Sequence, residues 1–76
     1  MEDLKSVLDF LLYALNHYGL EVDRTDGKHV YLKKGYEIEI EQASLFKLLH
    51  NHSVIAPFDD VGELCHFIQQ DIQLNE

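Results

Sequence analysis

The stretch LEVDRTDGKHVYLKKGYEIEIE, residues 20–41, decides the fold, because apolar residues alternate with polar ones along much of its length. This period is that of a β-strand whose side chains point in turn to a buried and a solvated face. Two turns that end in glycine interrupt the pattern, at Thr25–Gly27 and at Lys33–Gly35. The stretch therefore predicts three short antiparallel strands joined as a meander.

The lengths of these turns set the register of the strands. A two-residue loop at residues 26–27 would place Val22 beside Tyr31 and turn one apolar set to the wrong face. Three-residue loops, each with a left-handed glycine at its end, restore the phase and align Val22, Val30 and Ile38 in one row. We therefore expect the same turn to occur twice.

The opposite face of this meander is acidic. It carries five carboxylates, diluted by His29 and Lys33: Glu21, Asp23, Glu37, Glu39 and Glu41. Residues on one face of a strand lie about 6.6 Å apart, which is close to the phosphate spacing along one strand of DNA. This acidic face is either an ordinary solvated surface or a nucleic-acid mimic that inhibits a DNA- or RNA-binding protein.

Helical spacing flanks the meander on both sides. Residues 4–18 place their apolar side chains on one side of a helical wheel, and Gly19 followed by Leu20 suits a helix C-terminus. Residues 43–51 return to helical spacing, with Leu45, Leu48 and Leu49 pointing inward. These segments predict the first and second helices.

The C-terminal third adds a connector and a third helix. Residues 54–57 end in a proline, which pushes the residue before it toward extended geometry. They form either an extended connector, which we favour, or a short edge strand. Asp60 and Glu63 have the spacing of a capping box, so a helix begins near Val61. Cys65 is among the apolar residues of this helix that point inward. Residues 73–76 are expected to fray. The predicted fold is one α+β domain over residues 1–76: helix, three-stranded antiparallel β-meander, helix, extended connector and helix, with the helices packed on one face of the sheet.

Composition restricts the partners. Fourteen Asp and Glu against six Lys and Arg give a net charge of −8 in 76 residues. This charge repels nucleic-acid phosphates and anionic membranes and favours basic partners. The single cysteine cannot form an internal disulfide, and the acidic start is unlike a signal peptide. We therefore expect a cytoplasmic protein that binds neither nucleic acid directly nor membrane.

Few residues point to chemistry. His50, His52 and His66 are the weak candidates for a metal site, because residues two apart on a helix do not converge. Cys65 falls on an apolar helix face, where a free thiol behaves as a small hydrophobe. The glycines stand singly, so no phosphate-binding loop can be drawn. The sequence predicts no enzyme and no cofactor.

Aromatic residues outside the apolar stripes are a better indication of function. Phe10, Tyr13 and His17 follow one another by three or four residues on the first helix, and Phe67 lies beside the stripe of the last. Exposed aromatics are typical of interfaces. The sequence predicts a small acidic, non-catalytic protein–protein interaction or regulatory module, whose partner is another protein or a second copy of the chain. A nucleic-acid mimic and a metal-binding protein using His50, His52 and His66 remain the alternatives.

Overall fold

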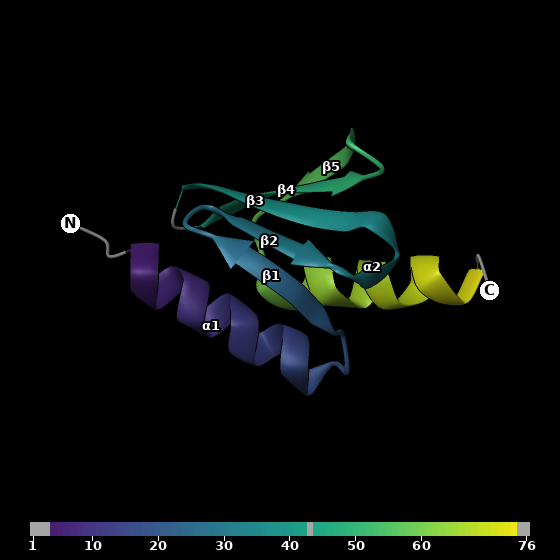
Figure 1. The fold of residues 1–76 in the computed structure, drawn as a ribbon, viewed down its shortest axis with the longest axis horizontal. Helices are drawn as coiled ribbons and strands as arrows, with labels where there is room; N and C mark the ends of the chain where they lie inside the picture. Colours follow the sequence, from purple (N-terminus) through teal and green to yellow (C-terminus); the bar gives the residue numbers. More distant parts are fainter. Residues whose placement is uncertain (1–3, 43, 75–76) are drawn as a thin grey trace.

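The computed structural model describes residues 4–42 and 44–74. Within them, the chain forms an α-helix, a five-stranded antiparallel sheet in the order β1-β2-β3-β4-β5, and a second α-helix. The elements are α1 (Leu4–His17), β1 (Val22–Asp26), β2 (His29–Leu32), β3 (Tyr36–Gln42), β4 (Leu45–His50), β5 (Ser53–Phe58) and α2 (Val61–Leu74), with a 3₁₀ turn at Lys33–Gly35. Both helices lie on the same face of the sheet (Figure 1). The fold is a two-layer α+β structure.

The core lies between the helices and the sheet. Its centre is a row in which Val30 is opposite Ile38 and Ile38 is opposite Leu48, on three neighbouring strands. All three side chains are fully buried. The helices cover this row with their own buried residues, which are Leu11, Leu15, Leu64, Cys65 and Ile68. Burial of these side chains is the main stabilising contribution in so small a chain.

Both terminal helices were predicted from local signals, and the structure confirms them. At the end of α1, Gly19 has a φ of +75°, and the Leu20 N–H donates to the Leu15 carbonyl at 2.9 Å, which is a Schellman C-cap. At the start of α2, the Glu63 N–H donates to Oδ1 of Asp60 at 3.0 Å. Of residues 73–76, which are predicted to fray, residues 73–74 belong to α2 and residues 75–76 lie outside the described part.

The predicted second helix is wrong. Residues 45–50 form β4, an inner strand of the sheet between β3 and the edge strand β5. Phe46 and Leu48 point into the core, whereas Lys47 points to the outer face and lies 2.6 Å from Glu41. A helix here would have left the backbone N–H and C=O groups on one side of β3 without partners. As a strand, β4 forms hydrogen bonds with them.

The predicted connector is also wrong, and its alternative, an edge strand, is correct. Residues 53–58 form β5, which pairs with β4 and has a bulge at Ile55. Asn51 and His52 form the two-residue loop between these strands, with φ values of +52° and +69°. Two left-handed residues match the twist of a tight hairpin, so the chain folds back and β4 gains a neighbour. Pro57 is tolerated because β5 is at the edge.

The register of β1 differs from the prediction as well. Asp26 is opposite His29, so the first loop has two residues, and a bulge between Val22 and Arg24 restores the phase. Val22 is therefore opposite Leu32 and does not join the row of Val30. The second turn, Lys33–Gly35, has the predicted three residues and a left-handed glycine.

Candidate protein-binding site

The exposed aromatic side chains of α1 form a ridge. Phe10 and Tyr13 lie one turn apart, with 58% and 68% of their surfaces exposed. His17 follows one turn later, and its ring stacks on Tyr13 with 6.4 Å between the centroids. We call these three residues the aromatic ridge. Their predicted position outside the core is confirmed, and their binding of a protein remains a prediction.

Phe67 is not part of this ridge. It lies on α2, is half-buried against the core and packs on Phe58 of β5 with 5.5 Å between the ring centroids. The predicted set of four binding residues is therefore divided between two surfaces. Phe67 thus packs on β5, a strand that sequence analysis predicted only as the less favoured alternative to a connector.

A groove lies beside the ridge at the N-terminal half of α1. Its volume is about 380 Å³, and it is lined by Ser6, Val7 and Phe10 of α1, by Ser44 and Phe46, and by Asp59, Asp60 and Val61. We call it the α1 groove. Its apolar wall comes from three elements, and its two carboxylates come from the loop that leads into α2. Phe10 belongs to both the ridge and the groove.

Carboxylates of the predicted acidic face lie beside basic side chains of the same chain. Glu37 and Glu39 each lie 3.8 Å from Nε2 of His29. Lys33 pairs with Asp23 at 3.2 Å, and Lys47 pairs with Glu41, which raises the pKa of Lys47 through the hydrogen bond and the nearby negative charge. Asp23 and Glu41 thus pair with lysines, whereas Glu37 and Glu39 share the ring of one histidine. Glu21 precedes β1 in the chain.

The outer face of the sheet also carries apolar side chains. One of its rows runs across all five strands as Arg24, Tyr31, Glu37, Leu49 and Val54. Arg24 lies 4.2 Å from the centre of the Tyr31 ring, which is a cation–π contact. The apolar end of the row comes from β4, which was predicted as a helix, and from β5, which was predicted only as the alternative to a connector.

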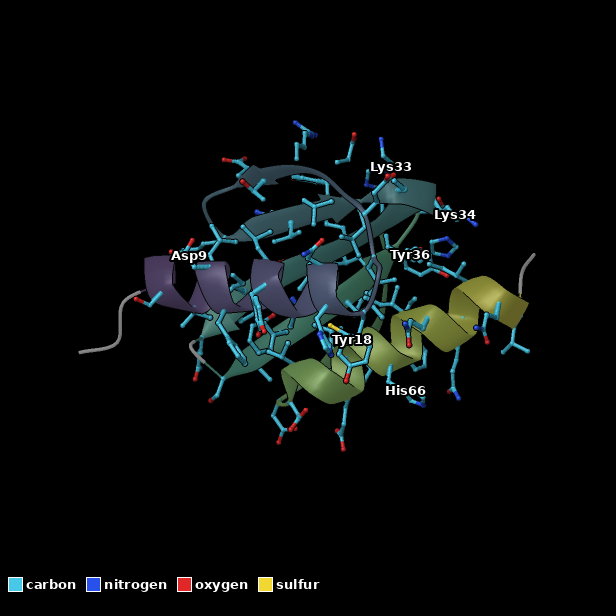
Figure 2. The ribbon with its side chains drawn as sticks, turned by 90° about the horizontal axis from the view of Figure 1, so that it is seen from below. Asp9, Tyr18, Lys33, Lys34, Tyr36 and His66 are labelled. Atoms are coloured by element: carbon cyan, nitrogen blue, oxygen red, sulfur yellow. The ribbon has the colours of Figure 1, made fainter. Side chains whose placement is uncertain are left out.

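The three candidate histidines do not converge. The ring of His50 stacks on Tyr36, and its Nε2 lies 3.1 Å from the Lys34 carbonyl. His52 is in the neighbouring turn, and His66 is exposed on the side of α2 away from α1 (Figure 2). In residues 4–42 and 44–74, no three side chains of the metal-ligating types are grouped.

The thiol of Cys65 lies in the core, as predicted. Burial raises the pKa of this thiol to about 11, so it is protonated at neutral pH. A protonated thiol is a poor nucleophile. Cys65 therefore acts as a small apolar side chain that packs between the helix and the sheet.

A second cleft, of about 460 Å³, lies at the opposite end of α1, between the Lys33–Gly35 turn and α2. Its apolar wall includes Leu20, Leu32 and Ile68. The charged residues that line it are Glu21, Lys33 and Lys34, and the ammonium group of Lys33 is paired with Asp23. The cleft thus carries charges of both signs.

The comparisons with known proteins define no family for this fold. No known protein family, no curated protein and no solved structure matches the chain. In the part of the chain that the structure describes, neither helix is of the length and apolar character needed to cross a bilayer. Fold and site together thus describe a two-layer α+β protein with an exposed aromatic ridge beside a groove that has an apolar wall.

Proposed function

We propose that this chain is a small, non-catalytic protein-binding module that holds its partner on the aromatic ridge of α1. The observation that carries this proposal is the exposure of Phe10 and Tyr13, at 58% and 68%, side by side on one helix face. The core does not need them, because α1 already fills it with Leu11 and Leu15. Aromatic anchors of this kind contribute most of the binding free energy at many interfaces.

The ridge supports the proposal better than the sheet does. Asp23 and Glu41, two of the carboxylates predicted to form an acidic face, already pair with lysines of the same chain. A phosphate mimic needs unpaired negative charge, because its affinity comes from basic groups on the partner. An aromatic ridge needs no such charge, since burial of apolar area drives its association.

The test compares two baits in affinity capture from the native cell. One is the wild-type chain and the other is the double variant Phe10→Ser/Tyr13→Ser. Two exposed hot-spot aromatics are each worth about 2 kcal/mol, so a retained protein should bind the variant at least about thirtyfold more weakly. The retained protein is then purified and its affinity is measured by calorimetry.

A matched control separates this effect from a general loss of apolar surface. Val54→Ser/Leu74→Ser removes two exposed apolar side chains, at 57% and 83% exposure, from β5 and α2. This variant should retain the partner. Equal binding by the ridge variant and the wild type would disprove the proposal. Sedimentation of the wild type over a range of concentrations shows whether the partner is a second copy.

A further inference from the structure

We propose that the α1 groove receives an apolar side chain from a partner segment whose neighbouring residues are Lys or Arg. This inference rests on the proposed function, because Phe10 belongs to both the aromatic ridge and the groove. It goes further in two respects. It names the anchoring pocket, and it assigns the choice of partner to the carboxylates at that pocket and not to the sheet face.

The wall of the groove suits an apolar side chain. Val7 and Phe10 form it from α1, Phe46 from β4 and Val61 from the start of α2. Phe46 is buried and Val61 is half-buried, so these residues are held in place by the core. The volume of about 380 Å³ falls within the roughly 300–1,000 Å³ of small ligand pockets. A single leucine, methionine or phenylalanine side chain can enter.

The charges of the groove are of one sign. Asp59 and Asp60 are both exposed and line it, and none of the described residues that line it is cationic. Glu63 adds a further exposed carboxylate in the first turn of α2. A basic side chain beside the apolar anchor would therefore meet negative charge on this side of the groove.

Helix capping does not account for both aspartates. Asp60 caps α2, because its Oδ1 accepts the Glu63 N–H. Asp59 has no hydrogen bond or ion pair with the part of the chain that the structure describes. Capping requires one carboxylate at this position, so Asp59 is free to pair with a partner. This contrasts with the sheet face, where Glu41 and Asp23 already pair with lysines.

The probe for this inference is an amphipathic peptide made of leucine and lysine, with its leucine and glutamate counterpart as the control peptide. Titration is followed in the amide spectrum of the full chain. The leucine–lysine peptide should shift the amides of Val7, Phe10, Phe46 and Val61. The leucine–glutamate peptide should leave them unchanged. Raising the salt from about 0.1 M to about 1 M should weaken the binding without abolishing it, because screening removes only the charge contribution.

Two variants of equal charge locate the carboxylates that matter. Asp59→Asn/Asp60→Asn removes both charges at the groove and keeps a residue that caps helices well. Glu21→Gln/Asp26→Asn removes two exposed charges of the β1 hairpin, one just before β1 and one at its end, and neither residue lines the groove. Exposed ion pairs are weak, so the groove variant should bind the peptide about three- to tenfold more weakly. The hairpin variant should bind less than about twofold more weakly. Amide spectra of the two free variants that differ from the wild-type spectrum only near the substitutions confirm their folding.

Several results would overturn the inference. These are equal binding by the two variants, equal binding of the two peptides, and peptide shifts at Tyr13 and His17 without shifts at Phe46 and Val61. Shifts of the groove amides with protein concentration alone would also overturn it, because the occupant would then be a second copy. The proposed function fails separately, if Phe10→Ser/Tyr13→Ser keeps its native partner. If that variant loses the partner and Asp59→Asn/Asp60→Asn does not, only this inference fails.

Discussion

Tyr36 donates its phenolic hydrogen to the carboxylate of Asp71, which joins the start of β3 to the C-terminal half of α2. The Tyr36 side chain is 3% exposed, and His50 stacks on its ring with 4.3 Å between the centroids. Figure 2 shows Tyr36 between the Lys33–Gly35 turn and α2. Burial, the hydrogen bond to Asp71 and the negative charge of Asp71 together raise the pKa of Tyr36 to about 12.

Tyr36→Phe should lower the free energy of unfolding by about 1–2 kcal/mol at neutral pH, because it removes a hydrogen bond to a charged acceptor and keeps the ring. The folded-state pKa lies above the value of about 10 for an exposed tyrosine. The hydroxyl therefore stabilises the fold fully below about pH 10, and this contribution is lost as the pH rises towards 12. Urea unfolding of both proteins should give stabilities that converge over this window. A difference in stability between the two proteins that stays constant from pH 10 to pH 12 would contradict the raised pKa of Tyr36.

Cys65 should react with iodoacetamide only when the chain opens. The thiol is fully buried, and its burial raises its pKa to about 11, so both access and thiolate content are low near pH 8. Mass spectrometry of the alkylated chain should show slow labelling without denaturant and a steep increase through the urea transition. Labelling of the folded chain as fast as of the unfolded chain would place the thiol at the surface.

The two terminal helices could be predicted because each has its signals within its own sequence. Gly19 ends α1, and Asp60 caps α2 through a bond to a residue three positions away. Neither signal depends on the arrangement of the rest of the chain. The same is true of the second meander turn, where Gly35 has the expected left-handed φ of +85°.

The β4 strand could not be predicted, because its apolar residues lie on both faces of the sheet. Leu48 points into the core, and Leu49 lies half-buried on the outer face, opposite Glu37 and Val54. Adjacent leucines break the alternation that marks a half-buried strand and produce the spacing of an amphipathic helix. Only the need of β3 for a second neighbour favours the strand, and that need is not local.

The same limit applies to the candidate site. Phe10 and Tyr13 lie outside the apolar arc of one helix, so a helical wheel is enough to find them. The groove beside them needs Phe46, Asp59 and Val61, which come from other parts of the chain. Sequence analysis predicted Phe46 to lie in a helix, so it could not show that this side chain lies beside α1. The ridge was thus predictable, and the groove required the topology.

Substitutions of Leu48 and Leu49 discriminate between the strand and a helix. Leu48 is fully buried between Ile38 and Ala56, so Leu48→Ala should lower the free energy of unfolding by about 2–5 kcal/mol. Leu49 lies half-buried on the outer face, so Leu49→Ala should lower the free energy of unfolding by less than about 1.5 kcal/mol. Urea denaturation of both variants measures the difference. A helix with both leucines inward would give similar losses, and such a result would contradict the position of β4.

Gly35→Ala should destabilise the chain more than Gly27→Ala does. Both glycines have positive φ values, of +85° and +54°, and a left-handed alanine costs roughly 1 kcal/mol or more at either position. A Cβ at Gly27 meets nothing within 4 Å, whereas a Cβ at Gly35 would lie 2.5 Å from Oδ1 of Asn51. The Asn51 side chain must leave its position to make room, since the Asn51 backbone is held by its N–H, which donates to the Gly35 carbonyl at 3.0 Å.

The second substitution Asn51→Gly separates the two contributions at Gly35. It removes the side chain that a new Cβ would meet, and glycine is well suited to the φ of +52° at this position. In the Asn51→Gly background, Gly35→Ala should therefore cost no more than Gly27→Ala does in the wild type, about 1 kcal/mol. Thermal unfolding of the single and double variants gives the coupling free energy directly. A loss at Gly35 that is the same with and without the Asn51 side chain would show that the backbone conformation alone, and not the contact between the turns, requires this glycine.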